Sequence, residues 1–241
     1  MVEKLKSISK PIPWSLVAKS VVLSGVWYFL PLPFFLALAL FFYFVPLFKP
    51  SDLGAPFMVT LVLSFFLETG FWTAFFMAVA MYLILGTKDL IFINRKAVYE
   101  TLVFILLFTL FMYFFLELGT WFGIMSVLWS VVIGFFSFAL FRGFINYDRV
   151  LSEELGPEAG SHKFLVIGLA SFFIWQLLWV LVFLPVGPTY QTAILFLVSI
   201  ILLEFVLAYF SRNLTPRRVL FNFTLFFIFL VFILTSTRWE L

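Results

Sequence analysis

Polar side chains inside apolar segments are the first place to look for chemistry in this sequence. Glu204, in ILLEFVLAYFSR, stands within an apolar run about two turns before Arg212. A carboxylate there is typical of proton- or cation-coupled transport, because an ionisable group in hydrocarbon is costly and is usually functional. The alternative is a structural carboxylate near the lipid headgroups, neutralised by Arg212, Arg217 or Arg218.

Two further carboxylates, Glu68 and Glu117, occupy the same place in a repeated motif. The pattern FFLExGxW occurs at 65–72 and again at 114–121. If both copies form turns on the outer side of a membrane, the carboxylates could form a paired site for a cation or a basic substrate. Alternatively, each glutamate lies in its own turn in water at the interface.

Three more polar residues are candidates for contacts with other helices or with lipid. Gln176, in FFIWQLLWV, and Asn222, in LFNFTLFF, are placed to hydrogen-bond neighbouring helices, and such bonds contribute about 0.6 kcal/mol on average. Arg142 flanks a polar segment together with Arg149 and His162, and could bind an anionic headgroup or a phosphorylated lipid carrier. Retention of positive residues on the cytoplasmic side explains the same charges.

This sequence lacks the residues that most enzyme chemistries require. There is no cysteine, a single histidine at 162, and only three aspartates, at 52, 89 and 148. Disulfides, thiolate metal sites, histidine relays and paired intramembrane aspartates are therefore absent. The motifs HExxH, GxSxG, Walker A and GxGxxG do not occur. We expect no metal or other cofactor, and the sequence does not predict an enzyme.

The composition indicates which elements must position these residues. Of the 241 residues, 64% are hydrophobic and only 11% are charged, with 38 phenylalanines and a mean hydropathy of +1.17. Soluble domains carry about 25% charged residues. The sequence thus excludes a soluble globule, a disordered chain and a nucleic-acid binder, and predicts a multi-pass integral membrane protein.

Apolar runs predict an all-α bundle of transmembrane helices. Five runs have about the 20 residues that span a bilayer: 97–118, 120–141, 164–184, 189–210 and 217–236. The runs 20–48 and 56–86 are longer. Turns at 30–33 and 68–71 would divide them, giving about nine helices built from hairpins. The alternative has seven helices, the first two long and tilted, with Glu68 near the middle of the bilayer.

Charge sorting predicts one integral membrane domain over 1–241 and its orientation. In the hairpin arrangement fourteen of the fifteen lysines and arginines fall on one side, and only Arg238 falls on the other. Positive loops stay cytoplasmic. We therefore expect a plasma-membrane protein of bacterial type with its N-terminus inside and its C-terminus outside. Residues 1–19 would form a basic interfacial segment containing Trp14, and 142–163 the main cytoplasmic loop.

One segment carries a resemblance to known sequences. The stretch LILGTKDLIFINRKAVYETLVFILLFTLF resembles uncharacterised Phe/Leu-rich polytopic membrane proteins of candidate-phyla bacteria, in which a hydrophobic helix ends in an Asn-Ile-Phe-Asn-type loop. Residues 89–95 would correspond to that loop, although its usual leading Glu-Asn is Lys88-Asp89 here. Glu153 and Glu154, in a loop after a predicted helix, also fit. The resemblance implies no activity.

Three functional hypotheses follow from these observations. The first is a non-catalytic membrane protein: a scaffold, an assembly factor or an accessory subunit. The second is a small-molecule or lipid transporter that uses Glu204. The third is a membrane-embedded transferase acting on lipid intermediates, with Glu68 or Glu117 as base and Arg142 on a phosphate. The expected partners are the lipid bilayer and other membrane subunits or a second copy of the chain, and no nucleic acid.

Overall fold

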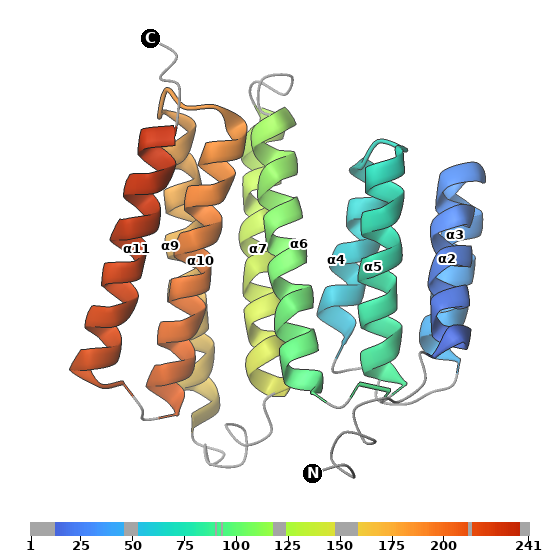
Figure 1. Ribbon diagram of the computed structural model, residues 1–241, viewed down its shortest axis with the longest axis horizontal. Helices are drawn as coiled ribbons and strands as arrows, with labels where there is room; N and C mark the ends of the chain where they lie inside the picture. Colours follow the sequence, from blue (N-terminus) through green and yellow to red (C-terminus); the bar gives the residue numbers. More distant parts are fainter. Residues whose placement is uncertain are drawn as a thin grey trace, which may run out of the picture.

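The chain folds into an all-helical bundle in the computed structural model. The structure describes residues 13–45, 53–89, 91, 92, 94–117, 124–147, 159–211 and 214–236. Within these ranges there are nine helices and no strand (Figure 1): α2 (Trp14–Phe29), α3 (Leu32–Phe44), α4 (Gly54–Phe66), α5 (Phe71–Lys88), α6 (Arg95–Glu117), α7 (Ile124–Tyr147), α9 (Ala159–Val182), α10 (Pro188–Phe210) and α11 (Pro216–Ser236). The predicted hairpin arrangement is confirmed, and the seven-helix alternative is wrong.

Proline and glycine set the turns that divide the long apolar runs. Pro31 precedes α3, which has Pro33 in its first turn, and Pro188 is the first residue of α10. Proline suits these positions because its fixed φ fits the first turn, where its missing N–H is not needed. Between α4 and α5 the backbone is extended at Leu67 and at Gly70. These turns lie where the sequence predicts them.

Helix length separates the first three helices from the other six. Helices α5, α6, α7, α9, α10 and α11 are long and apolar enough to cross a membrane, so the chain is a multi-pass membrane protein. In contrast, α2 has 16 residues, and α3 and α4 have 13 each. A helix of 13 residues is about 20 Å long, shorter than the roughly 30 Å hydrocarbon core. Such helices fit a locally thinned bilayer.

The helices lie side by side along one direction, in an order close to that of the sequence (Figure 1). Helix α2 packs mainly on α5, α6 on α10, and α7 on α9, so long-range packing joins successive hairpins. Helices α6 and α7 lie between the N-terminal helices α2–α5 and the C-terminal helices α9–α11. Helix α11 stands at the edge of the bundle and packs mainly on α10.

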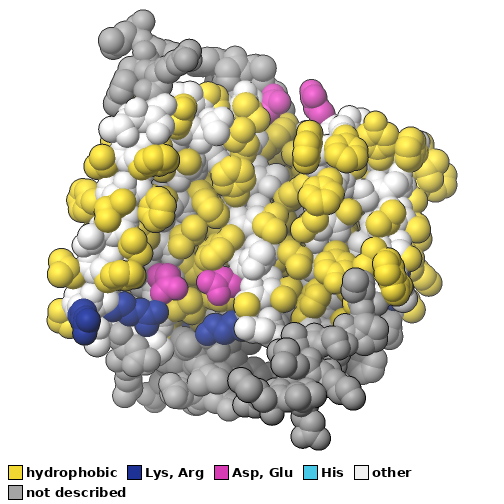
Figure 2. All heavy atoms as spheres, in the orientation of Figure 1, with side chains coloured by type: hydrophobic (Ala, Val, Ile, Leu, Met, Phe, Trp, Pro, Cys, Tyr) yellow, Lys and Arg dark blue, Asp and Glu magenta, His cyan; other side chains and the backbone are white. Residues whose placement is uncertain are grey.

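Charged residues distinguish the two ends of the bundle (Figure 2). All described lysines and arginines lie near the end where α2 begins, which we call the basic end: Lys19, Lys88, Arg95, Lys96, Arg142, Lys163, Arg217 and Arg218. At the opposite end, the acidic end, the described charged residues are Glu68 and Glu117. Helix α11 finishes at the acidic end. Within the described ranges the positive charges are sorted as the sequence predicts.

Several predicted features lie outside the described residues or change their extent. Outside the described residues are Lys49, Asp52, Asp148, Arg149, Glu153, Glu154, Arg212, Arg238 and residues 1–12 of the basic segment. The predicted loop 142–163 is partly helical, because α7 continues to Tyr147 and α9 begins at Ala159.

Candidate functional site

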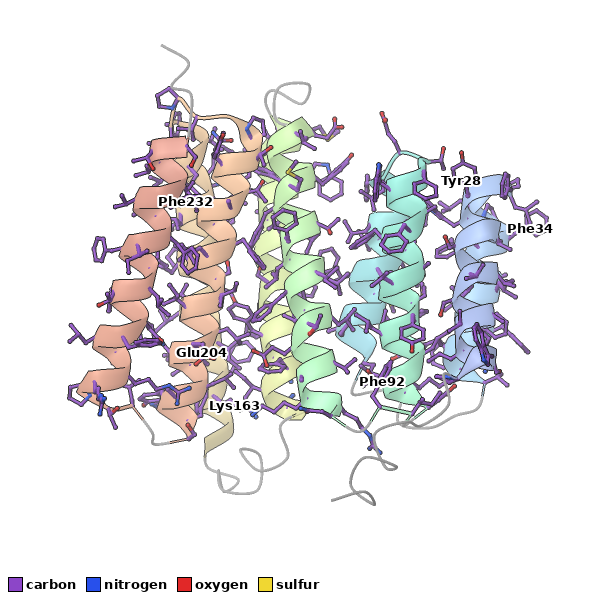
Figure 3. All side chains as sticks on the ribbon, in the orientation of Figure 1. Tyr28, Phe34, Phe92, Lys163, Glu204 and Phe232 are labelled. Atoms are coloured by element: carbon purple, nitrogen blue, oxygen red, sulfur yellow. The ribbon has the colours of Figure 1, made fainter. Side chains whose placement is uncertain are left out.

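Glu204 forms an ion pair with the next helix. Its Oε2 accepts a hydrogen bond from Nη2 of Arg218 at 2.9 Å, joining α10 to α11. The two side chains are 37% and 43% exposed, and Glu204 lies toward the basic end of α10 (Figure 3). Of the two sequence interpretations, neutralisation by a neighbouring arginine describes this geometry.

A second carboxylate lies beside this ion pair. Glu100, on the first turns of α6, is close enough to Glu204 and to Lys96 for their charges to act on it. Together with Arg218 these residues form the basic-end cluster: Lys96, Glu100, Glu204 and Arg218, contributed by α6, α10 and α11. Two acids and two bases balance in charge, so the cluster suits joining three helices better than attracting a cation. The sequence does not single out Glu100, since its position just after Arg95 and Lys96 resembles an ordinary interfacial one.

The other two predicted carboxylates come to the same end of the bundle. Glu68, in the α4–α5 turn, and Glu117, at the end of α6, both lie close enough to Tyr113 for their charges to act on its phenol. Glu117 and Tyr113 also line a cavity of about 20 Å³ together with Ser126 and Trp129. That volume holds about one water molecule. The described residues contain no group of three or more His, Asp or Glu placed to hold a metal ion.

A larger apolar groove runs along the junction of α5 and α6. Its volume is about 710 Å³, and Tyr113 lines it as well as the small cavity. The groove extends from Leu67 and Trp72 near the acidic end to Thr101 near the basic end, with Phe196 of α10 on one side. Its wall is almost entirely apolar, which suits a hydrocarbon chain rather than a polar solute.

The predicted interhelical amides have different surroundings. Gln176 is exposed on α9 and Asn222 is half-buried on α11, and neither has a hydrogen bond to another described residue. Gln191, which the sequence analysis missed, has that role: its Nε2 donates to the carbonyls of Leu181 at 2.9 Å and Leu184 at 3.2 Å. These bonds tie the end of α9 to the start of α10. The turn rich in proline and glycine just before Gln191 is the sequence feature that could have indicated this role.

Arg142 lies in a basic patch at the end of α7. It is exposed and close enough to Lys163 on α9 for the two positive charges to interact. Nearby on α9, His162 is 3.4 Å from the Tyr209 hydroxyl. The patch lies at the basic end, whereas Glu68 and Glu117 lie at the acidic end. The described structure therefore does not bring together the residues that a lipid-intermediate transferase would need.

Lys88 is a buried cation that the sequence analysis missed. The residue is 2% exposed, and its Nζ donates to the carbonyl of Phe42 at 2.9 Å. Phe42 is near the end of α3, where the last four carbonyls of a helix have no partner within the helix. Lys88 therefore caps α3 from α5, with the Tyr43 ring centroid 5.9 Å from its Nζ. Next to it, Asp89 lies 3.8 Å from Lys19 of α2.

Comparisons with known proteins give no further guide to these residues. Neither a protein family, nor a curated protein, nor a solved structure matches the chain. The resemblance of the 83–111 region to candidate-phyla membrane proteins thus stays a prediction. Any functional proposal has to come from the geometry of the bundle.

Proposed function

We propose that this protein is a non-catalytic, multi-pass membrane protein that serves as a scaffold, assembly factor or accessory subunit, and that it contacts its partner through α11. The basic end would face the cytoplasm, which puts the N-terminus inside and the C-terminus outside a bacterial plasma membrane. The described polar groups support this proposal, because most of them bond within their own helix or join two helices rather than surround a shared cavity.

The observation that carries the proposal is that α11 is exposed along its length. In the most apolar window of the other five long helices, 33–50% of residues are buried, and in α11 none is. Large apolar side chains point outward along its length: Leu220, Phe221, Phe227, Ile228, Val231 and Phe232. A continuous exposed apolar surface is where another transmembrane helix can pack.

Helix α11 is nevertheless fixed in position. Arg218 bonds to Glu204 at the basic end, and the Tyr190 hydroxyl donates to the carbonyl of Ser236 at 2.9 Å at the acidic end. Between them, the Phe205 and Phe223 rings lie 5.7 Å apart. These contacts hold the helix near both ends and leave most of its surface open. A helix held in this way is prepared to receive a partner without rearranging.

Photo-crosslinking tests the proposal. A benzophenone amino acid replaces Phe232 on α11 in one variant and Phe34 on α3 in a matched control. Both residues lie near the acidic end and point outward (Figure 3), with exposures of 69% and 61%. In native membranes we expect discrete protein adducts from position 232 and only lipid adducts from position 34. Lipid adducts alone from both positions would overturn the proposal.

A second candidate function, lipid transport, is favoured by one observation. The groove of about 710 Å³ between α5 and α6 reaches from the side of Glu68 and Glu117 toward the basic-end cluster. Headgroups could thus meet charges near both ends while a chain follows the apolar wall. Lipid flux in reconstituted vesicles tests this function. Absence of flux, or flux that Glu204→Gln leaves unchanged, would remove the version in which Glu204 acts.

A further inference from the structure

The geometry of α9 points to self-association. We propose that two copies of this chain pair in the membrane through the outward face of α9, and that Gln176 of one copy hydrogen-bonds Gln176 of the other. This inference goes beyond the proposed function. It concerns a different helix and a different partner from the α11 surface, so either one can fail without the other.

Gln176 points away from the bundle. The buried residues of α9 include Ile174 and Leu178, which stand two positions before and two positions after it. Two residues along an α-helix correspond to a rotation of about 200°, so positions i and i±2 face opposite sides. The structure accordingly leaves Gln176 exposed while Ile174 and Leu178 are buried.

Lipid leaves this amide without a hydrogen-bonding partner. Gln176 is six residues before the end of α9 at Val182, or about 9 Å along the axis, and hence within the apolar zone. An amide transferred to an apolar medium without a hydrogen bond is destabilising, and acyl chains offer neither donor nor acceptor. Several polar side chains of other helices avoid that loss: Thr60, Thr192 and Ser199 each donate to a carbonyl of their own helix.

The residues around Gln176 have the spacing of a helix-packing seam. Leu169, Phe173, Gln176 and Val180 of α9 are all exposed, at successive intervals of four, three and four residues. This is the heptad spacing at which two helices pack side by side. One polar residue in an otherwise apolar seam fixes the register and the number of helices that associate. The seam therefore favours one defined partner helix over the surrounding lipid.

A second copy is the partner that fits a lone glutamine. The amide has both a donor and an acceptor, so two glutamines related by a two-fold axis satisfy each other with two N–H···O bonds. Beside the seam, a groove of about 440 Å³ between α7 and α9 is lined by Gly134, Gly168 and Phe172. It leaves room for aromatic side chains of the opposing α9. Its wall also holds Ser171, whose buried hydroxyl has no partner in the structure.

Disulfide trapping on the cysteine-free chain tests the geometry. A single cysteine replaces Gln176, and in a matched control it replaces Phe229. Phe229 is exposed on α11 at a similar distance from the acidic end. In oxidised membranes we expect the 176 variant to form a covalent dimer at least several-fold more efficiently than the 229 variant. Equal or lower dimer yield at 176, or a disulfide from residue 176 to a different protein in place of the dimer, would overturn the proposal.

A dissociation constant keeps the test independent of cysteine chemistry. We expect Gln176→Leu to weaken dimerisation of donor- and acceptor-labelled chains about 3- to 30-fold in lipid bicelles, from the range measured for interhelical hydrogen bonds. Gln176→Asn keeps an amide and should lose less, and Phe229→Leu should change nothing. Because residue 176 is exposed, Leu there leaves the fold intact. A Leu variant that associates as tightly as the wild type would contradict the hydrogen bond across the axis.

Discussion

Helices α2–α5 and helices α6–α11 use their polar groups differently. Between the N-terminal helices, the described hydrogen bonds run from a side chain to the backbone of another helix. The Ser24 hydroxyl donates to the Ala74 carbonyl at 2.6 Å, the Trp27 indole to Ser64 at 3.1 Å, and Lys88 to Phe42 at 2.9 Å. These bonds connect α2, α3, α4 and α5 into one unit.

Between the C-terminal helices, several of the described bonds join two side chains, such as Trp175 to Ser130 and Arg218 to Glu204. Serine and threonine hydroxyls in both regions mostly bond within their own helix, as those of Thr60 and Ser199 do.

Two of the acceptors between N-terminal helices, Ser64 and Phe42, lie in the last turns of the short helices α4 and α3, where the carbonyls have no partner within the helix. Donors from α2 and α5 therefore satisfy the ends of these two short helices.

The largest expected effect comes from removing Lys88. We expect Lys88→Ala to lower the free energy of unfolding by about 3 kcal/mol, because a bond from a charged donor contributes about 1.5–3 kcal/mol and a buried stem is lost as well. Unfolding in mixed micelles, followed by tryptophan fluorescence, measures this change. The control is Arg142→Ala, an exposed change expected to stay within about 0.5 kcal/mol. Equal effects would show that Lys88 does not cap α3.

Gly86 provides the next largest effect. A Cβ at this position would fall on the ring of Phe92 and 2.9 Å from Cδ2 of Leu16. The segment after α5 folds back here, since the Ile91 N–H donates to the Gly86 carbonyl at 3.0 Å. We expect Gly86→Ala to destabilise by about 2 kcal/mol through overpacking, measured by the same unfolding transition.

A glycine in the C-terminal helices is the matched control. A Cβ on Gly168 of α9 would meet no atom within 4 Å. Because alanine favours a helix over glycine, Gly168→Ala should be neutral or stabilising by up to about 1 kcal/mol. Adding Phe92→Ala to Gly86→Ala should recover part of the loss. Destabilisation by both glycine changes alike would refute the close packing at Gly86.

The sequence predicts the helices well because their boundaries are encoded locally. Proline at 31, 33 and 188 and glycine at 70 mark turns by their own backbone preferences, and all four lie at the observed boundaries. The ion pair of Glu204 was also among the alternatives, since an arginine 14 residues away across a short turn must lie near it.

The helix faces could not be predicted from the same sequence. Nearly every side of these helices is apolar, so periodicity does not distinguish Gln176, which is exposed, from Gln191, which is buried and bonded. Lys88 was hidden for a similar reason. A lysine at a helix end next to Asp89 resembles the positive residues that set the orientation of a membrane protein. Only the three-dimensional structure shows the Phe42 carbonyl beside it.

A smaller effect is expected for the indole bonds of the two regions. Trp27→Phe removes the donor to the Ser64 carbonyl, and Trp175→Phe removes the donor to the Ser130 hydroxyl at 3.2 Å. We expect about 1 kcal/mol for Trp27, which is buried and joins two short helices. Trp175 is only half-buried and should lose less. The unfolding transitions of both variants show which one loses more stability. A larger loss of stability for Trp175→Phe than for Trp27→Phe would contradict the expected difference between the two regions.

The smallest effect concerns the ion pair at the start of α11. Its carboxylate and guanidinium are both more than a third exposed, so solvent and salt screen their attraction. We expect Glu204→Gln to reduce stability by about 0.2–1 kcal/mol, less than any of the changes that destabilise the N-terminal unit, and the difference should shrink in high salt. The unfolding transition at low and high salt measures both quantities. A salt-independent loss of several kcal/mol would instead show that Glu204 is bound as tightly as Lys88, and the contrast between the two regions would fail.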